Sequence, residues 1–329
     1  MSHIPVMLDH VVDHLAPKAG EVILDGTFGG GGYTRALLTS SDCHVVGVDR
    51  DPDALARSVA VKDDFGERFT MLPGRFGDVE ALLADAGIKE LDGLVLDLGV
   101  SSFQLDQGER GFSFMREGPL DMRMSKSGPS AADVVNHADE GTIADIIFQL
   151  GEERDSRRIA RKIVAVRKEQ PFQTTLQLAD AIETAMGGRR GKRTHPATKS
   201  FQALRMFVND ELGELARALM AAEKVLKTGG RLVIVTFHSL EDRMVKAFLA
   251  ERSGKMSGGS RFVPDASSSS PEPSFEAVRK VSAPESAEVA ANARARSSRL
   301  RSAVRTAAPA WAQEVNRPGN LPELEEVLS

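Results

Sequence analysis

The segment from Val22 to Asp49 constrains the fold most strongly, because it combines a strand, a glycine-rich turn, a helix and a second strand that ends in a carboxylate. The apolar run 22–24 ends at Asp25, and the turn that follows, GTFGGGG (26–32), has almost no side chains to hold a ligand away from the backbone. Helical periodicity follows through 35–38, and the β-prone run 45–48 ends at Asp49, about 20 residues after Gly29, where a carboxylate can reach ribose hydroxyls. The segment therefore predicts the nucleoside-binding half of an α/β sheet.

The glycines do not fit the dinucleotide pattern GxGxxG, since Thr34 stands five positions after Gly29 and Arg35 five after Gly30. This mismatch weakens a phosphate-cradling role and favours a sulfonium nucleoside, so we expect S-adenosyl-L-methionine as cofactor in preference to NAD. Two other classes stay open. One is a nicotinamide-dependent oxidoreductase, and the other is a non-catalytic RNA-binding assembly factor that S-adenosyl-L-methionine only stabilises.

Composition limits the protein's surroundings and partners. With 329 residues, 41% of them hydrophobic, the chain can bury a full α/β core and still carry a second, smaller domain. The single cysteine, Cys43, excludes an internal disulfide and a cysteine metal cluster, and we expect no metal. No apolar run could cross a bilayer and no signal peptide is apparent, so we expect a cytoplasmic protein without membrane contact. A net charge of −5 indicates that any RNA-binding surface is local.

The sheet pattern continues and is then interrupted. The runs 69–72 and 94–96 predict further strands around a helix at 79–86, and the second of these strands ends at Asp97. Residues 101–130 show no period and predict a long loop. Capping boxes at Ser130–Asp133 and Thr142–Asp145 introduce predicted helices at about 142–150, 156–168 and 175–186, which indicates an all-helical insertion.

The second half of the chain returns to the α/β pattern. From Met206 apolar residues recur at helical spacing to residue 226, Gly229 and Gly230 predict the helix end, and 232–235 predict a strand. We expect Ser239 to cap the next helix, with Asp242 three residues on. Ligands bind at the carboxyl ends of the strands in open α/β sheets, so four side chains should converge there: Asp25, Asp49, Asp97 and His238. Residues 253–275, rich in Ser, Gly and Pro, predict a flexible surface excursion.

Three basic clusters stand out against the acidic average. For the cluster at 154–168, a solvated face and a polyanion-binding face are equally good interpretations, because acidic residues precede it. The other two clusters contain no acidic residue, so we expect them to contact RNA phosphates. Their members are Arg189, Arg190, Lys192, Arg193, His195 and Lys199 in one, and Arg294, Arg296, Arg299 and Arg301 in the basic C-terminal tail.

Long, non-repetitive strings in these segments resemble one family, the bacterial 16S ribosomal RNA cytosine-N4 methyltransferases that act on the decoding region. The strings cover nearly the whole chain and include DGTFGGGGYTRALL (25–38), LDGLVLDLGVSSFQLD (91–106), HPATKSFQALRMFVNDEL (195–212) and GGRLVIVTFHSLEDRMVK (229–246). The resemblance implies a class I, Rossmann-like S-adenosylmethionine-dependent methyltransferase core, with a helical substrate domain inserted between its fourth and fifth strands. The corresponding domains are 1–104 and 206–329 for the core and 105–205 for the insertion.

The resemblance also implies site residues and a reaction. The cofactor contacts carried over are Gly31, Gly32, Tyr33, Asp49, Phe76, Asp97 and Gln104, with Tyr33 standing where histidine is commoner. The implied reaction is N4-methylation of a cytidine in 16S rRNA during small-subunit maturation. We expect small ribosomal subunits or their precursors to be better substrates than naked fragments, and the sequence leaves the oligomeric state open, a dimer included.

The chemistry requires a proton acceptor near the target amine, whose lone pair is delocalised into the cytosine ring. We expect direct in-line transfer to a base turned out of its stack, without a covalent intermediate. DNA amino-methyltransferases place two prolines after their polar residue, whereas the strand here continues Asp97-Leu98-Gly99-Val100. The two candidate catalytic residues are therefore His238, which would meet the base, and Asp97, which the cofactor would also occupy.

Overall fold

The computed structural model describes residues 5–189, 191, 194–255, 271–276, 282–317 and 319–328. The chain divides into two compact units, which we call the sheet unit and the helical unit. The sheet unit comprises Met1–Gly99 and Gly213–Arg317, and the helical unit comprises Val100–Leu212 and Pro318–Ser329. These boundaries lie near the expected 104/105 and 205/206, except that residues 318–329, which we placed with the core, belong to the helical unit.

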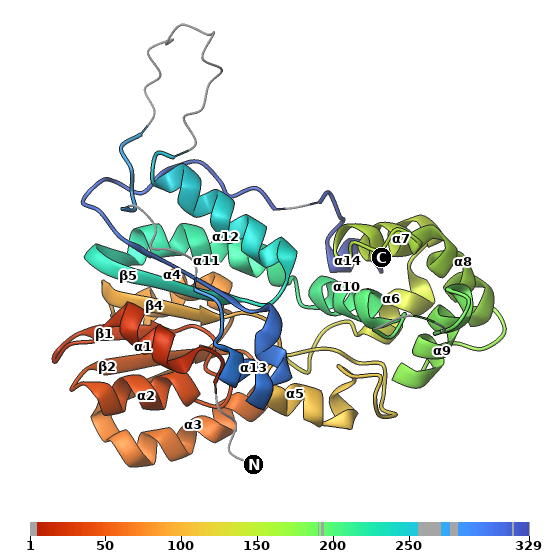
Figure 1. The fold of residues 1–329 in the computed structure, drawn as a ribbon, viewed down its shortest axis with the longest axis horizontal. Helices are drawn as coiled ribbons and strands as arrows, with labels where there is room; N and C mark the ends of the chain where they lie inside the picture. Colours follow the sequence, from red (N-terminus) through yellow and green to blue (C-terminus); the bar gives the residue numbers. More distant parts are fainter. Residues whose placement is uncertain are drawn as a thin grey trace, which may run out of the picture. The chain divides into compact units, whose positions relative to one another are not determined.

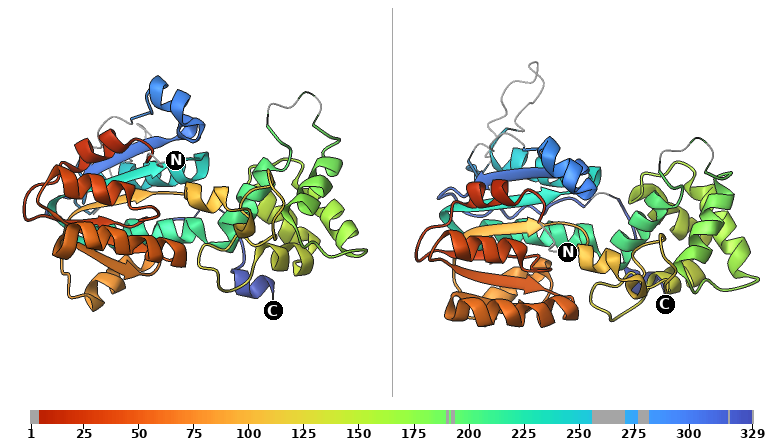
Figure 2. Two further views of the ribbon diagram at one scale, coloured as in Figure 1. Left: turned by 90° about the horizontal axis from the view of Figure 1, so that it is seen from below. Right: turned by 60° about the horizontal axis from the view of Figure 1, so that its bottom comes forward.

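The sheet unit is built on a six-stranded sheet with the order β3-β2-β1-β4-β5-β6. Its strands are β1 (Val22–Asp25), β2 (His44–Asp49), β3 (Phe69–Pro73), β4 (Leu91–Asp97), β5 (Leu226–Thr236) and β6 (Arg299–Val304). Strands β1 to β5 pair in parallel, and β6 pairs antiparallel with β5 at one edge, where Figure 2 shows it in blue. The parallel strands therefore end at one rim of the sheet, and this rim carries the predicted polar side chains. This arrangement confirms the predicted Rossmann-like core.

Helices cover both faces of this sheet (Figure 1). They are α1 (Leu8–Leu15), α2 (Gly32–Ser40), α3 (Pro52–Phe65), η1 (Gly66–Arg68), η2 (Phe76–Asp78), α4 (Val79–Asp85), α11 (Glu211–Val225), α12 (Ser239–Arg252), α13 (Ser286–Ala291) and η4 (Ala293–Ser297). On one face, apolar side chains of α1 and α2 such as Leu15 and Leu37 pack against strand residues such as Ile23, Val95 and Val233, all of them fully buried. Near-continuous apolar strands are what a parallel sheet covered on both faces requires.

The helix predicted from Met206 to residue 226 is confirmed from Glu211 to Val225, but its predicted start is wrong, because residues up to Val208 belong to a separate helix. Helix α10 (Thr198–Val208) ends before Asp210, whose φ of 47° is left-handed and interrupts the helical backbone. Helix α11 ends at Val225, and the glycine pair Gly229 and Gly230 lies inside β5, where its backbone exchanges hydrogen bonds of 2.8 Å with Arg305. Glycine is thus used here for a strand irregularity and not as a helix stop.

The segment between β4 and β5 is helical, as predicted. Before α11, its elements are α5 (Ser102–Asp106), η3 (Gly108–Arg110), α6 (Ala131–His137), α7 (Glu140–Gln149), α8 (Ser156–Arg167), α9 (Thr175–Ala185) and α10. The helical unit also contains α14 (Leu324–Val327), near the C-terminus. The capping box Ser130–Asp133 is confirmed at α6. The one at Thr142 is wrong, because α7 begins earlier and Asp139 is the cap that accepts from the Thr142 backbone N–H at 3.0 Å.

Residues 101–130, which we predicted as one loop, contain α5 and are held by buried side chains. The Arg110 guanidinium donates to the carbonyls of Arg123 and Met124, at 3.1 and 2.9 Å. The Asn209 amide accepts from the Met124 N–H at 2.9 Å and donates to the Met122 carbonyl at 2.7 Å. These bonds satisfy backbone groups that lie outside helices and strands.

Two predictions concern the chain's outer segments. Residues 318–329 join the helical unit because the Gln149 side chain accepts from the Asn320 backbone N–H at 2.9 Å. The predicted excursion at 253–275 falls mainly on 256–270, which lie outside the described residues.

Among the helices that the structure describes, none has the length and apolar character needed to cross a bilayer.

Candidate functional site

Asp25 ends β1 and is almost completely buried, with 1% of its surface exposed. Its carboxylate accepts from the Thr34 hydroxyl at 2.7 Å and from the Thr27 backbone N–H at 3.3 Å. Burial raises the pKa of Asp25 to about 6, and the charge of nearby Asp49 contributes in the same direction. Asp25 thus fastens the glycine-rich turn to the end of its strand.

Asp49 ends β2 and faces the same turn. Its two oxygens accept from the backbone N–H groups of Gly29, at 2.7 Å, and Asp51, at 2.8 Å. A carboxylate offers about four lone-pair sites, so each oxygen can still accept from a ligand hydroxyl. Burial raises the pKa of Asp49, while the two backbone bonds lower it. This geometry suits the expected contact with a ribose diol.

The glycines of the turn are required by their backbone and their neighbours. Gly31 has a φ of 74°, and a Cβ there would lie 2.8 Å from Cζ of Phe28. A Cβ at Gly32 would lie 2.1 Å from Cγ of Pro5, at the point where α2 begins. Side chains at these positions would therefore strain or displace the turn.

Asp97 ends β4 and carries an unsatisfied polar atom. Its backbone N–H donates to the Thr27 hydroxyl at 2.7 Å, which ties β4 to the glycine-rich turn. Its Oδ1 is buried and has no hydrogen-bond partner among the described residues. Burial raises the pKa of Asp97 well above its usual range, and the charges of Asp25 and Glu241 raise it further, while the Tyr33 hydroxyl beside the carboxyl group lowers it. An unpaired buried carboxylate oxygen is costly, so it indicates a place where a ligand supplies the missing donor.

Tyr33 is a buried residue of α2, with 4% of its surface exposed. Its hydroxyl donates to the backbone carbonyl of Val6. Burial raises the pKa of this phenol, and the charges of Asp97 and Asp25 add to the shift. The hydroxyl therefore stays protonated and holds the N-terminal segment beside the strand ends.

His238 caps α12, a position that we had given to Ser239. His238 Nδ1 accepts from the Glu241 backbone N–H at 3.4 Å, while the Glu241 carboxylate accepts from the backbone N–H groups of Phe237, at 2.8 Å, and His238, at 3.3 Å. His238 Nε2 lies 2.9 Å from Glu241 Oε1, a distance that permits an ion pair without hydrogen-bond alignment. Both ring nitrogens thus face Glu241, and the ring must turn for one of them to face a substrate.

Glu241 is a site residue that sequence reasoning missed. It is 2% exposed, and its charge contributes to the raised pKa of Asp97, so the ends of β4 and β5 share one polar cluster. The H-S-L-E string at 238–241 carries the capping-box signal, one residue before the S-L-E-D string that we used. The predicted convergence of Asp25, Asp49, Asp97 and His238 at the strand ends is consistent with these contacts.

Phe76 begins η2, the turn after β3. The Cβ that Gly26 lacks would lie 3.4 Å from the Phe76 Cβ, so Phe76 stands against the end of β1. The turn is held by Glu214 of α11, which is 1% exposed. Its carboxylate accepts from the Gly77 backbone N–H at 2.9 Å and from the Arg75 guanidinium at 3.0 Å, and Arg50, the neighbour of Asp49, lies 3.6 Å away. Glu214 is a second residue that the sequence did not reveal.

Gln104 lies in the helical unit, in α5. Its side-chain carbonyl accepts from the Ser101 backbone N–H at 3.0 Å, and its own N–H donates to the Ser101 hydroxyl at 3.2 Å. Gln104 therefore completes a capping box, and its role at the cofactor stays a prediction.

The basic residues predicted in the helical unit have different surroundings. Arg190, Lys192 and Arg193 lie outside the described residues. Arg189 and Lys199 are exposed, and Arg189 pairs with Glu183 at 2.6 Å. The His195 side chain is only 11% exposed and packs on Phe114 with ring centroids 4.5 Å apart. Burial lowers the pKa of His195 and Arg189 lowers it further, while the charge of Glu183, whose Oε2 lies 3.4 Å from His195 Nε2, raises it. A contact of His195 with RNA stays a prediction.

The basic tail residues also differ from one another. Arg296 and Arg299 are exposed, and the side chain of Arg294 is outside the described part of the chain. Arg301 in β6 forms a bidentate ion pair with Asp242, at 2.7 and 2.9 Å, with 11% of its side chain exposed. The Arg301 guanidinium therefore has a carboxylate partner within the protein, and its contact with RNA stays a prediction.

The sheet unit's strand-end residues fit a sulfonium nucleoside. Asp49 retains acceptor capacity for a diol, Asp97 Oδ1 needs a donor, and the Gly31 backbone approaches without a side chain. The polar groups that would hold S-adenosyl-L-methionine are therefore Asp49 and Asp97, with Phe76 beside them.

Comparison with known proteins gives the family. The family model described as "MraW methylase family" matches residues 1–306. "Ribosomal RNA small subunit methyltransferase H" of Hyphomonas neptunium is 57% identical over 99% of this chain and 95% of its own length. The protein of the same name from Caulobacter vibrioides is 56% identical over 94% and 97%. A solved rRNA methylase from Streptococcus thermophilus is similar at a TM-score of 0.42 and 10% identity, over 93% of this chain and 99% of that one, too distant to inform on function. The chain belongs to the MraW methylase family, and S-adenosyl-L-methionine is its cofactor.

Proposed function

We propose that this protein transfers the methyl group of S-adenosyl-L-methionine to N4 of a cytidine in the decoding region of 16S rRNA. The observation that carries the proposal is the buried Oδ1 of Asp97, which lacks a partner among the described residues beside a glycine-rich turn. The names of the relatives support small-subunit rRNA as the substrate. The cytosine N4 target rests on the sequence resemblance.

The sheet unit holds the methyl donor, S-adenosyl-L-methionine. Asp49 accepts hydrogen bonds from its ribose hydroxyls, Phe76 flanks its adenine, and Asp97 accepts from its remaining polar hydrogens. Gly31, Gly32 and Tyr33 shape the turn against which the donor lies. Bound S-adenosyl-L-methionine supplies an electrophilic methyl group, and the protein's own residues position the acceptor.

The acceptor amine needs a group that takes its proton as the new C–N bond forms. His238 is this group, and its ring turns away from the buried Glu241 carboxylate, 2.9 Å from Nε2, so that one ring nitrogen faces the amine. Asp97 is assigned to the cofactor because its backbone N–H donates a hydrogen bond to the hydroxyl of Thr27, in the glycine-rich turn. Transfer is direct, and the buried thiol of Cys43 takes no part.

The helical unit recognises the RNA, and the protein works in the cytoplasm during small-subunit maturation. In the domain assignment that we propose, residues 100–212 form the substrate-recognition insertion, and Gln104, a predicted cofactor contact, lies near its start. Arg189, Lys199, Arg296 and Arg299 are the described cations of the predicted sets with exposed side chains. Two basic sets, one in each unit of an acidic chain, favour shaped, assembled RNA over a short oligonucleotide.

The test is transfer of labelled methyl groups to small ribosomal subunits from cells that lack this gene. We expect label in 16S rRNA at N4 of cytidine, and much slower transfer to a naked stem-loop fragment. Equal rates on the fragment would contradict recognition of assembled RNA. Donor binding without transfer to any small-subunit RNA would instead favour a non-catalytic assembly factor.

A further inference from the structure

Helix α8 of the helical unit presents a basic face that the proposed site does not use. We define the α8 basic face as Arg154, Arg157, Arg158, Arg161, Lys162 and Lys168. The buried side of α8 is apolar, with Ile159, Ala160 and Ile163, so the helix is fixed by packing and its cations are left outside. Within α8 itself there is no acidic residue.

Most of these cations have no carboxylate within ion-pair distance in the part of the chain that the structure describes. Among the described residues, Arg161 is the one member within ion-pair distance of a carboxylate, and its Glu140 partner is 3.9 Å away with both side chains largely exposed. Arg167 is not part of this face. Its guanidinium donates to the carbonyls of Val135 and Ala138, at 2.8 and 2.7 Å, and thereby stabilises the C-terminal end of α6. A helix face with unneutralised charges at steps of three and four fits a polyanion better than a solvated ion-pair network.

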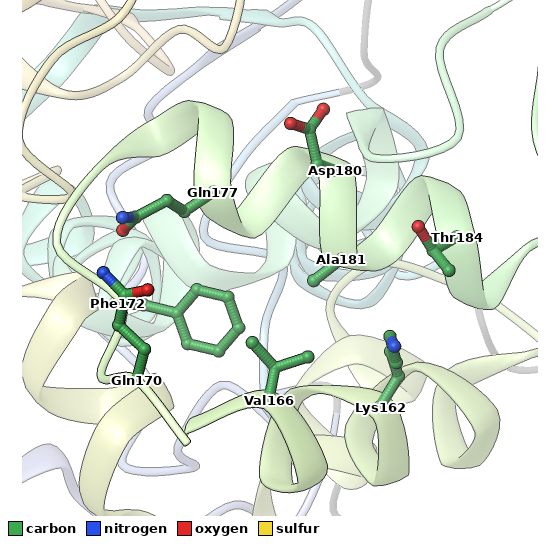
Figure 3. Close-up of a pocket in the computed structure, with 8 residues that line it drawn as sticks. All are labelled: Lys162, Val166, Gln170, Phe172, Gln177, Asp180, Ala181 and Thr184. Atoms are coloured by element: carbon green, nitrogen blue, oxygen red, sulfur yellow. The ribbon is translucent and has the colours of Figure 1, made fainter. Parts of the chain in front are cut away.

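A groove lies beside this face, between α8 and α9 (Figure 3). Its volume is about 270 Å³, and its floor is apolar, made by Val166, Phe172 and Ala181. Polar groups stand around the floor, among them Gln170, Asp180 and Thr184, and Lys162 connects the groove to the basic face. The groove is slightly smaller than the pockets that take drug-sized ligands, so a single planar ring suits it.

We propose that the α8 basic face and the α8–α9 groove bind single-stranded RNA, with phosphates on the arginines and one unpaired base in the groove. The inference rests on the proposed function, since it adds a second contact on the same rRNA. Unpaired RNA bases stack on apolar side chains and are read through their edges, and an apolar floor with amide, hydroxyl and carboxylate groups at its rim offers both contacts. An anionic lipid surface would use the cations but would leave the polar rim without a role.

The first test removes phosphate contacts and uses the full chain. Arg157→Ala/Arg158→Ala is compared with Lys18→Ala/Lys89→Ala, two exposed cations of the sheet unit, so that both variants lose equal charge. Binding to unmethylated small subunits is measured across a salt series. We expect Kd to rise roughly 10-fold for the α8 variant, and the slope of log K against log salt to fall by roughly 1.4, because each phosphate contact on a single strand contributes about 0.7. The control should stay within about twofold of wild type in the same measurement.

The second test asks whether an RNA base occupies the groove. It uses Asp180 because the negative charge of this residue repels phosphates, so a base contact and a phosphate contact predict opposite effects of its removal. If Asp180 accepts from a base amine, Asp180→Ala should weaken binding roughly 5-fold, and Asp180→Asn, which keeps an acceptor oxygen, should weaken it less. Tighter binding by Asp180→Ala would mean that only phosphates contact this surface, and would overturn the groove assignment.

Further outcomes separate this inference from the proposed function. Methyl transfer is then measured over a range of subunit concentrations. The α8 variant should keep kcat within about twofold of wild type, because the strand-end site is untouched, while its KM for subunits rises. Equal Kd values for the α8 variant and its control would overturn the inference while leaving methyl transfer intact. Co-sedimentation with phosphatidylglycerol vesicles that the α8 variant loses, alongside unchanged subunit binding, would overturn it in favour of a lipid surface. If wild type methylates no RNA, the proposed function fails, while the binding comparison still decides this inference.

Discussion

Replacing Glu214 should destabilise the sheet unit and weaken donor binding together. The carboxylate is 1% exposed and accepts from the Gly77 N–H and the Arg75 guanidinium, at 2.9 and 3.0 Å, with Arg50 at 3.6 Å. Removing one partner of a buried charged cluster costs about 3 kcal/mol, because the remaining groups keep their desolvation penalty. We therefore expect Glu214→Ala to lower the free energy of unfolding by about 3 kcal/mol, and Glu214→Gln, which keeps an acceptor oxygen, by about half of that.

The protein supplies its own reporter and control for this experiment. Trp311, the only tryptophan, lies in the sheet unit and stacks on Arg252, so its fluorescence reports urea unfolding of this unit. The control is Glu80→Ala, which removes an exposed ion pair to Lys224 of the same helix α11 and should cost less than about 1 kcal/mol.

The same substitution should affect the cofactor. Because Glu214 fixes the turn that carries Phe76, donor affinity measured by calorimetry should fall roughly 10-fold in Glu214→Ala and stay unchanged in Glu80→Ala. A Glu214→Ala protein as stable as the control, or one that binds the donor like wild type, would refute the reasoning.

Three further predictions concern the strand-end site. The pKa of Asp25 is raised to about 6, so folding favours its neutral form, and its contribution to the free energy of unfolding should fall by about 3 kcal/mol as pH rises from about 4 to 6. Asp25→Asn should remove this fall in urea titrations, and an unchanged pH profile would count against the assignment. His238→Ala should abolish methyl transfer while donor affinity stays within a few-fold, and an active variant would remove His238 from the mechanism. Gly31→Ala should cost about 2 kcal/mol and most donor binding, since its φ is 74° and its Cβ would lie 2.8 Å from Phe28, and a normal binding isotherm would contradict this.

The sequence predicted the sheet and its polar rim because both depend on local patterns. Apolar runs that end in a carboxylate are readable without knowledge of their neighbours, and parallel strands bring their ends together by topology alone. For this reason the sequence alone was enough to assign Asp25, Asp49 and Asp97 to one rim of the sheet.

The missed residues depend on contacts between distant segments or on ambiguous caps. Glu214 meets Gly77 across 137 positions of sequence, so no spacing rule relates the two. Arg301 has the sequence surroundings of a phosphate ligand but pairs with Asp242, because charge in a sequence does not reveal its partner. Two overlapping capping-box patterns begin one residue apart, at His238 and at Ser239. The sequence favours Ser239 as the cap, whereas the structure has His238 in that position.

The most direct test of the central claim is mass spectrometry of 16S rRNA nucleosides from cells that lack this gene, with the wild-type gene or the His238→Ala variant restored. We predict that N4-methylcytidine disappears from the decoding region on deletion and returns with the wild-type gene alone. An unchanged level of N4-methylcytidine in the deletion cells would contradict the account.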